Sequence, residues 1–340
     1  MAEPAASVLE VRDLKTVFRT RGGEIHAVND VSFHLRRGEL LGVVGESGSG
    51  KSVTMLSLLR LLPAPPAEIR GGQAILNGRD LLAMSDDELR AVRGAKVGFV
   101  FQDPMTSLNP VFTLGTQIME PLVKHMKMSR VRAEARAVEL LDLVGIPDAR
   151  RRLSQYPHQF SGGMRQRVMI AMALACNPDV LIADEPTTAL DVTIQAQILD
   201  LVKELRHKFG MAIIWITHDL GVIAGIADRV MVMYGGQIVE QAPVNKLFAV
   251  PQHPYTRALL QTIPRISGAR DARLKVIEGQ PPILTGPLTA CPFRARCEYR
   301  HATCDAENPA RRAIDGLPLG RGHDVACHWH APARAEVAHA

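Results

Sequence analysis

The segment 45–52, with the sequence GESGSGKS, constrains this chain more than any other. It fits the phosphate-loop pattern, in which backbone N–H groups surround phosphates, the lysine reaches the terminal ones and the serine hydroxyl ligates magnesium. The apolar run 40–44 is typical of a buried strand, and 53–62 of a helix whose N-terminus attracts anions. We therefore expect an α/β fold that binds a nucleotide. The expected binding residues are Gly45, Glu46, Ser47, Gly48, Ser49, Gly50, Lys51, Ser52 and Val53.

Two adjacent carboxylates follow another apolar run. Residues 180–183 are typical of a central parallel strand, and Asp184 and Glu185 come at its C-terminal end, where open α/β sheets place their ligands. We expect Asp184 to hold magnesium, directly or through water, and Glu185 to orient and deprotonate the attacking water. A solvated acidic turn is the alternative. The phosphate loop favours the catalytic interpretation, because magnesium–phosphate chemistry needs such groups.

Three more polar residues come at the ends of predicted elements. Gln102 follows the apolar run 97–100 and could reach magnesium or the attacking water. His218 follows the run 212–217; alone it would fit a structural role, but its strand-end position favours a contact to the γ-phosphate. Asp191 opens a predicted helix that stops at Gly210, and an N-cap is the simplest account of it.

A second anion site is predicted at Ser161, Gly162 and Gly163, which precede the predicted helix 164–175. A hydroxyl, two glycine N–H groups and a helix N-terminus all favour negative charge. One nucleotide does not need two such helix ends from a single chain. Two chains arranged head to tail would supply one of each per nucleotide.

In this order the motifs resemble an ATP-binding-cassette (ABC) ATPase over roughly residues 8–245. The resemblance implies a RecA-like core, a small antiparallel β subdomain, a helical signature subdomain, and two cassettes that sandwich two ATP molecules. The signature differs from the commonest form at Phe160 and Met164, and we expect these changes to tune packing or to mark a subfamily. Phe18 matches the aromatic that stacks on adenine in the family, although it could equally be a core residue. The resemblance implies that the partner's nucleotide is contacted by Ser161, Gly162, Gly163 and Met164. It also places Asp191 in the D-loop, and it implies that magnesium is bound by Ser52, Gln102 and Asp184.

The C-terminal residues 251–340, together with the run 101–110, resemble the ATPase subunits of bacterial dipeptide, oligopeptide and nickel importers. This resemblance implies a nucleotide-binding domain at 8–250 with a helical subdomain at about 103–170, and a C-terminal extension at 251–340. It implies uptake of dipeptides or oligopeptides, with nickel or another small solute as the alternative. The implied partners are a second ATPase subunit (a paralogue in preference to a copy), two transmembrane permease subunits and an extracytoplasmic substrate-binding protein. The implied location is the cytoplasmic face of the cytoplasmic membrane.

Four of the five cysteines gather in the extension: Cys291, Cys297, Cys304 and Cys327. An ATP-using protein is expected in the cytoplasm, where disulfides are rare, so metal ligation is the better interpretation. Four thiolates fit either zinc or an iron–sulfur cluster. The spacing lacks the close pairs that structural zinc sites favour, and the resemblance to peptide importers points the same way, to a structural [4Fe–4S] cluster.

Composition limits the remaining possibilities. A chain of 340 residues that is 46% apolar can bury one large core and an appendage, and no apolar run approaches the ~20 residues of a transmembrane helix. The net charge of +5 suits an anionic partner, but no nucleic-acid-binding motif is present, so no nucleic acid is expected. Two other function classes stay open: a soluble cassette protein that acts on ribosomes or DNA, and a redox or metal module that the cassette regulates.

Overall fold

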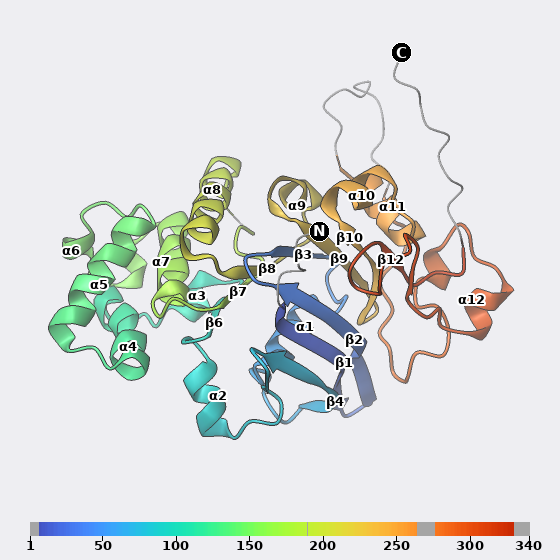
Figure 1. Ribbon diagram of the computed structural model, residues 1–340, viewed down its shortest axis with the longest axis horizontal. Coiled ribbons are helices and arrows are strands. Elements are labelled where there is room, and N and C mark those ends of the chain that lie inside the picture. The colour runs from blue at the N-terminus through green and yellow to red at the C-terminus, as the bar shows by residue number, and fades with distance from the viewer. Residues whose placement is uncertain (1–6, 189, 264–275, 330–340) are drawn as a thin grey trace, which may run out of the picture. The chain divides into compact units, whose positions relative to one another are not determined.

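The computed structural model describes residues 7–188, 190–263 and 276–329 (Figure 1). The chain divides into two compact units. The first comprises 1–9, 35–40 and 83–216, and the second comprises 10–34, 41–82 and 217–340. The predicted extension 251–340 therefore includes two stretches, 264–275 and 330–340, that lie outside the described residues.

Three parallel strands form the sheet of the first unit. They are β6 (Val97–Val100), β7 (Val180–Asp184) and β8 (Ala212–Thr217). β7 lies in the middle, with its first residue opposite both Val97 and Ala212. Every side chain of β7 and β8 is buried, as the unbroken apolar runs require of a parallel strand covered on both faces. The strands predicted from these runs are confirmed.

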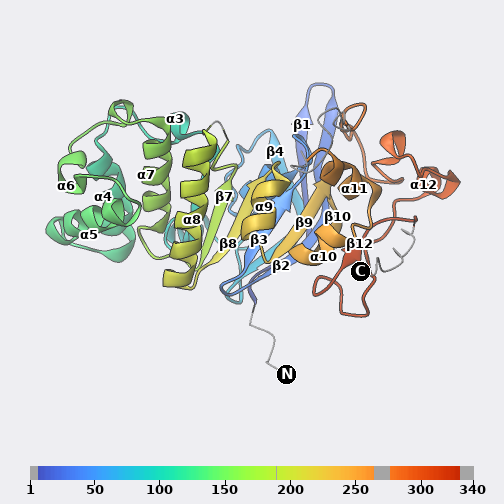
Figure 2. The same cartoon turned by 90° about the horizontal axis from the view of Figure 1, so that it is seen from above.

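Helices make up the rest of the first unit. In Figures 1 and 2 the helices α4, α5 and α7 lie side by side, and they pack against one another. α8 begins after its N-cap Asp191 and ends at Gly210, as predicted. The helices are α2 (Asp86–Val92), α3 (Pro104–Ser107), α4 (Leu114–Met126), α5 (Arg130–Leu143), α6 (Ala149–Arg152), a 3-10 turn at Pro157–Gln159, α7 (Gly162–Leu174) and α8 (Val192–Phe209).

The second unit contains two groups of strands. The order β2-β1-β4-β5 forms a four-stranded sheet in which β4 and β5 are antiparallel. In the other group β3 runs parallel to β9, and β9, β10, β12 and β11 follow in antiparallel pairs. The strands are β1 (Ser7–Thr20), β2 (Gly23–Arg36), β3 (Leu40–Val44), β4 (Ala67–Leu76), β5 (Arg79–Asp80), β9 (Arg229–Tyr234), β10 (Gln237–Pro243), β11 (Arg312–Ala313) and β12 (Asp324–Val325).

The helices of the second unit are short. α1 begins at Lys51 and ends at Leu58, both earlier than the predicted 53–62, because the last glycine of the loop leads directly into the first helical turn. Among the described residues, no helix combines the length and the apolar composition that crossing a bilayer requires. The other helices are α9 (Leu220–Ile226), α10 (Val244–Ala249), α11 (Pro254–Gln261), a 3-10 turn at Arg294–Arg296 and α12 (Ala302–Ala306).

Candidate functional site

The predicted phosphate loop lies between β3 and α1, in the second unit. Gly45, Gly48 and Gly50 all have positive φ, at 153°, 78° and 95°. At Gly50 a side chain is also excluded by space, since a Cβ would stand 2.6 Å from the carbonyl oxygen of Ala27. The sequence therefore needs glycine here, and the backbone leads directly into the N-terminus of α1, an end that favours an anion.

Lys51 brings the positive charge of this loop. Its side chain is only 5% exposed, and its ammonium donates hydrogen bonds to the carbonyl oxygens of Gly45 (2.8 Å) and Glu46 (2.9 Å). The loop thus wraps around the ammonium group. A buried cation next to helix-terminal amides makes a strong binding site for phosphate.

Phe18 lies on the face of β1 that points to α1. The hydroxyls of Thr16 and Ser57 are 2.8 Å apart, so Thr16 faces α1. Phe18, two residues further along the strand, points to the same face and is partly exposed. This position suits an aromatic platform beside the phosphate loop, and its role in stacking adenine stays a prediction.

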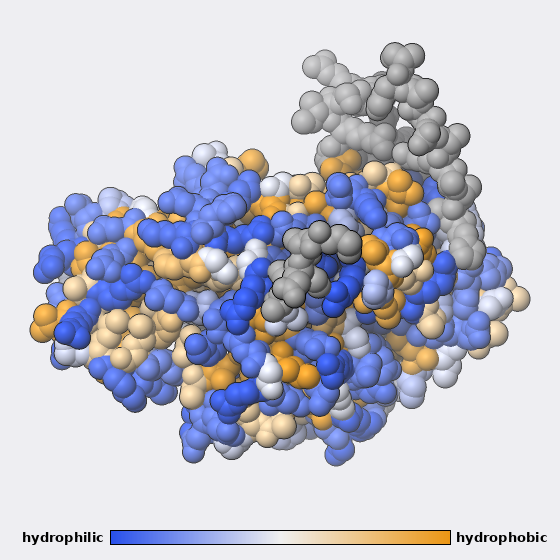
Figure 3. Space-filling model, in the orientation of Figure 1, coloured by the Kyte–Doolittle hydropathy of each residue, from blue (hydrophilic) through white to orange (hydrophobic). Residues whose placement is uncertain are grey.

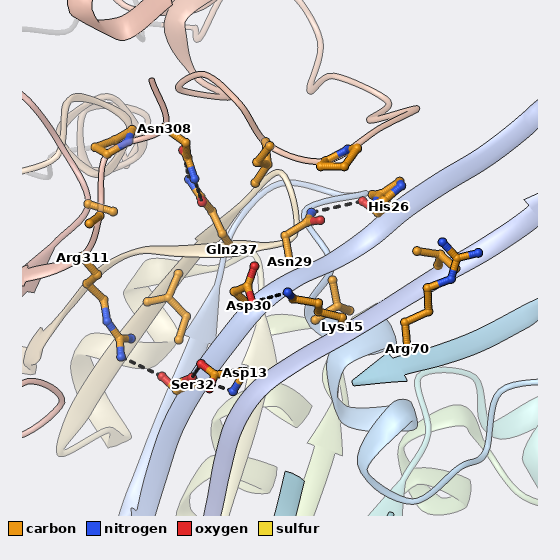
Figure 4. A pocket seen from close by; sticks show the side chains of 18 of the residues that line it. Asp13, Lys15, His26, Asn29, Asp30, Ser32, Arg70, Gln237, Asn308 and Arg311 are labelled. Atoms are coloured by element: carbon orange, nitrogen blue, oxygen red, sulfur yellow. Dashed lines mark hydrogen bonds and ion pairs between the residues drawn. The ribbon is translucent and has the colours of Figure 1, made fainter. Parts of the chain in front are cut away.

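A cavity of about 440 Å³ lies elsewhere in the second unit (Figure 4). Lys15 and Val17 line it, and these residues alternate with Thr16 and Phe18 along β1. Two of its charged groups have partners: Lys15 pairs with Asp30 at 2.9 Å, and Nη2 of Arg311 donates to the carbonyl oxygen of Ser32 at 2.8 Å. Because it opens on the other face of the strand, this cavity is not the nucleotide site.

In the first unit Glu185 and Gln102 meet. The Gln102 amide nitrogen donates to Oε2 of Glu185 at 3.0 Å, and the Thr188 hydroxyl donates to the same oxygen at 3.0 Å. Glu185 has φ of +46°, which a non-glycine residue adopts at a cost of about 1–3 kcal/mol. Asp184, just before it, is 6% exposed at the end of β7. The two donors and the unusual backbone hold the Glu185 carboxylate at the strand end.

The signature segment begins α7. The Ser161 hydroxyl accepts the backbone N–H of Met164 as the helix N-cap, and Ser161 and Gly162 are exposed. Gly163 has a packing reason of its own, because a Cβ there would lie 2.7 Å from a methyl group of Ile194. Phe160 is 3% exposed, which fits its expected role in packing.

Asp191 and His218 complete the predicted set. Asp191 caps α8 by accepting the N–H of Ile194 at 2.9 Å, which confirms the N-cap. His218 follows β8 and is exposed, while Asp219 beside it caps α9. His218, Phe18 and the phosphate loop belong to the second unit.

The predicted metal cluster is wrong. Within the described residues, no three His, Cys, Asp or Glu side chains are arranged to hold a metal ion, and all five cysteines are free. Burial raises the pKa of Cys291 to about 11 and that of Cys327 to about 12. In the free chain these two groups are therefore thiols at neutral pH. The prediction for Cys297 and Cys304 fails with the others, for zinc as for [4Fe–4S].

Sequence reasoning missed two residues that contact the phosphate loop. The Tyr255 hydroxyl accepts the backbone N–H of Glu46 at 2.8 Å, and Arg296 pairs with the Glu46 carboxylate at 2.6 Å. Neither residue belongs to a nucleotide-binding motif. Both lie in the segment 251–340, whose resemblance to importer ATPases does not indicate which residues contact the loop.

Two family models match this chain. "ABC transporter" matches residues 28–188, and "Oligopeptide/dipeptide transporter, C-terminal region" matches 239–304. The oligopeptide transport ATP-binding protein OppD of Bacillus subtilis is 55% identical over 86% of this chain and 82% of its own length. The chain belongs to the ATP-binding proteins of the oligopeptide/dipeptide ABC transporter family. As such it is an ABC-type ATPase.

Other relatives agree with this assignment of the ABC ATPase. The dipeptide transport ATP-binding protein DppD of Bacillus subtilis is 51% identical over 97% of both chains. Among solved structures, the ATP-binding cassette MJ0796, dimeric and bound to ADP and Pi, has a TM-score of 0.63 and 29% identity over 69% of this chain and 98% of its own. The mixed α/β fold predicted from the phosphate loop is therefore the ABC ATPase fold.

Proposed function

We propose that this ABC ATPase drives the import of dipeptides or oligopeptides, by coupling ATP binding and hydrolysis to rearrangement of separate membrane subunits. The observation that carries the proposal is the Glu185 carboxylate, which accepts hydrogen bonds from Gln102 and Thr188 at the end of a buried parallel strand. A carboxylate fixed in this way can orient a water molecule and take its proton. The peptide substrate class follows from the relatives, which are named oligopeptide and dipeptide transport proteins.

Each part of the catalytic machinery has a proposed role. The loop amides and Lys51 bind the β- and γ-phosphates, and Phe18 stacks on the adenine. Ser52 and Asp184 supply the hard oxygen ligands that magnesium prefers, and Mg²⁺ when bound neutralises phosphate charge. Glu185 acts as the general base, with Gln102 as its orienting donor. His218 contacts the γ-phosphate, and its exposed position leaves it accessible to a ligand.

Ser161, Gly162, Gly163 and Met164 are proposed to bind the nucleotide held by a partner cassette, with Asp191 in the D-loop. Ser161 and Gly162 are exposed at the N-terminus of α7, a helix of 13 residues, so their polar groups face solvent. Helix N-termini favour phosphate. We propose a paralogous ATPase subunit as that partner, in preference to a second copy.

The membrane partners are proposed to dock on the helical part of the first unit. Apolar residues interrupt the hydrophilic surface on the side where α4 and α5 lie (Figure 3). Exposed apolar side chains of this size mark interaction sites when they gather on one part of a chain. The exposed large apolar side chains between residues 101 and 131, the stretch that contains α3 and α4 and the start of α5, are Phe101, Met105, Val111, Phe112, Val123, Met126 and Val131. We propose that two permease subunits cover them and place the ATPase at the cytoplasmic face of the membrane, and that an extracytoplasmic binding protein delivers the peptide.

Glu185→Gln tests the proposal directly. The variant should bind ATP like the wild type while hydrolysis falls by roughly 10²–10⁴, which corresponds to about 3–5 kcal/mol of barrier. Uptake of a labelled dipeptide by cells that carry only the variant should fall in parallel. Glu204→Gln is the matched control, since Glu204 is an exposed carboxylate on α8. Hydrolysis close to the wild-type rate in Glu185→Gln would exclude the catalytic role.

A further inference from the structure

Arg296 reaches the phosphate loop from the C-terminal extension. Its Nη1 and Nη2 donate to the two carboxylate oxygens of Glu46, at 2.6 and 2.9 Å. Although 250 residues separate them in sequence, the Arg296 side chain is only 5% exposed and the Glu46 side chain 27%. Such a two-pronged, charge-assisted contact fixes both the distance and the orientation of the carboxylate.

Every N–H group of this guanidinium has an acceptor. Beside the two bonds to Glu46, Nη1 donates to the Tyr234 hydroxyl (3.2 Å), Nη2 to the carbonyl oxygen of Ile277 (3.1 Å) and Nε to that of Glu278 (2.8 Å). A guanidinium has five N–H donors, so none remains for another partner. The side chain is therefore built into one geometry, unlike a surface arginine that samples many.

Aromatic side chains surround the same point. The rings of Tyr234, Tyr255 and Phe293 lie 4.6–5.3 Å apart between centroids, and the Arg296 guanidinium is 5.8 Å from the Tyr234 ring. Tyr255 also accepts the backbone N–H of Glu46 at 2.8 Å. Glu46 is thus held twice, by its carboxylate from Arg296 and by its backbone from Tyr255.

Glu46 in turn belongs to the part of the loop that surrounds Lys51. Its carbonyl oxygen accepts a hydrogen bond from the Lys51 ammonium at 2.9 Å, and its neighbour Gly45 accepts another at 2.8 Å. A displacement of Glu46 would move the lysine and turn the adjacent amides. Misplacement of binding groups by about 1 Å weakens such sites strongly.

We propose that the C-terminal extension is a positioning element for the phosphate loop, in which Arg296 sets the affinity for ATP by holding Glu46. This inference rests on the proposed ATPase function. All five N–H groups of Arg296 are engaged by the protein, so Arg296 acts through Glu46. The extension therefore contributes to nucleotide binding from outside the cassette's own motifs.

The test is nucleotide affinity in the purified full-length chain. Arg296→Met keeps an unbranched apolar stem but removes the donors, and should raise the dissociation constant for a fluorescent ATP analogue about tenfold. Arg296→Lys, which cannot make the two-pronged contact, should give an intermediate value. The KM for ATP should rise with kcat retained, because Glu185 and Gln102 are unchanged. Arg300→Met is the control, since Arg300 is half exposed and pairs with Asp305 instead.

A double-mutant cycle with Glu46→Gln separates positioning from loss of fold. If Arg296 acts through Glu46, Arg296→Met should weaken ATP binding by less than about twofold when Glu46→Gln is already present. Unchanged affinity in Arg296→Met, or effects of the two substitutions that simply multiply, would overturn the inference. A wild-type chain that neither binds nor hydrolyses ATP would instead refute the proposed function.

Discussion

Acidification should destabilise this protein through His253. The side chain is 1% exposed, and its Nδ1 accepts the backbone N–H of Tyr255 at 3.0 Å, which caps α11 and requires a neutral ring. Burial lowers the pKa of His253 from 6.5 to about 4, with the nearby Glu240 carboxylate opposing the shift. Below pH 6.5 the unfolded chain takes up a proton that the folded chain accepts only near pH 4. His253 therefore does not change the free energy of unfolding above about pH 6.5. As the pH falls from 6.5 to about 4, His253 lowers the free energy of unfolding by about 3 kcal/mol in total.

The assay is urea unfolding of the wild type and His253→Asn between about pH 7 and about pH 4.5. Asparagine keeps a cap acceptor but has no titrating group. The variant loses the contact of the ring with Phe293, at 5.8 Å between centroids, so its stability at neutral pH will be lower. The informative quantity is the slope: over this range the wild type should lose about 2–3 kcal/mol more than the variant. Equal slopes would refute the reasoning, because they would mean that the buried ring is protonated as easily as an exposed one.

Three other substitutions test single contacts. Lys51→Ala should raise the dissociation constant for ATP roughly 10–100-fold, measured with a fluorescent analogue, and an unchanged value would contradict the role of the loop lysine. Glu240→Gln should lower the free energy of unfolding by about 2–4 kcal/mol. Glu240 is fully buried, and its carboxylate is hydrogen-bonded to two backbone N–H groups and to the His323 ring, so an amide would bring a competing donor into the same place. A loss below about 0.5 kcal/mol in urea unfolding would exclude this explanation. Gly163→Ala should cost about 1–3 kcal/mol of stability by collision with Ile194, and Ile194→Ala in the same chain should recover most of it; no recovery would refute the packing account.

The sequence predicted those parts of the fold that short-range rules determine. Residues 180–183 and 212–217 could be recognised as strands because unbroken apolar runs suit parallel strands buried on both faces. Asp191 could be recognised as a helix start because a side-chain carboxylate there satisfies a backbone N–H group. Gln102 and Glu185 could each be placed at a strand end, although the hydrogen bond between them was not predicted. Each of these inferences needs only a few neighbouring residues and the topology of a parallel sheet.

The rest depended on contacts between distant parts of the chain. Nothing in the spacing of one sequence connects Arg296 with Glu46, because the pair is created only when the extension packs on the second unit's own loop. The cysteines illustrate the opposite error: their grouping in sequence predicted metal ligands, but no three His, Cys, Asp or Glu side chains of the described residues are arranged to hold a metal ion. Closeness in sequence shows which groups can meet, and the folded arrangement decides whether they do.

The pairing of β12 with β10 has a consequence for handling this protein. Residues 237–242 of β10 are buried, and Glu240 and Gln241 lie opposite Val325 and Asp324 of β12. A chain shortened before residue 324 would leave this row of backbone amides and carbonyls open, and open strand edges recruit further chains into aggregates. The native chain ends the sheet with β12 and β11, two strands of only two residues each, which offer little length for such recruitment. Shortened versions should therefore be judged first by their solubility, before any loss of activity is read as a loss of catalysis.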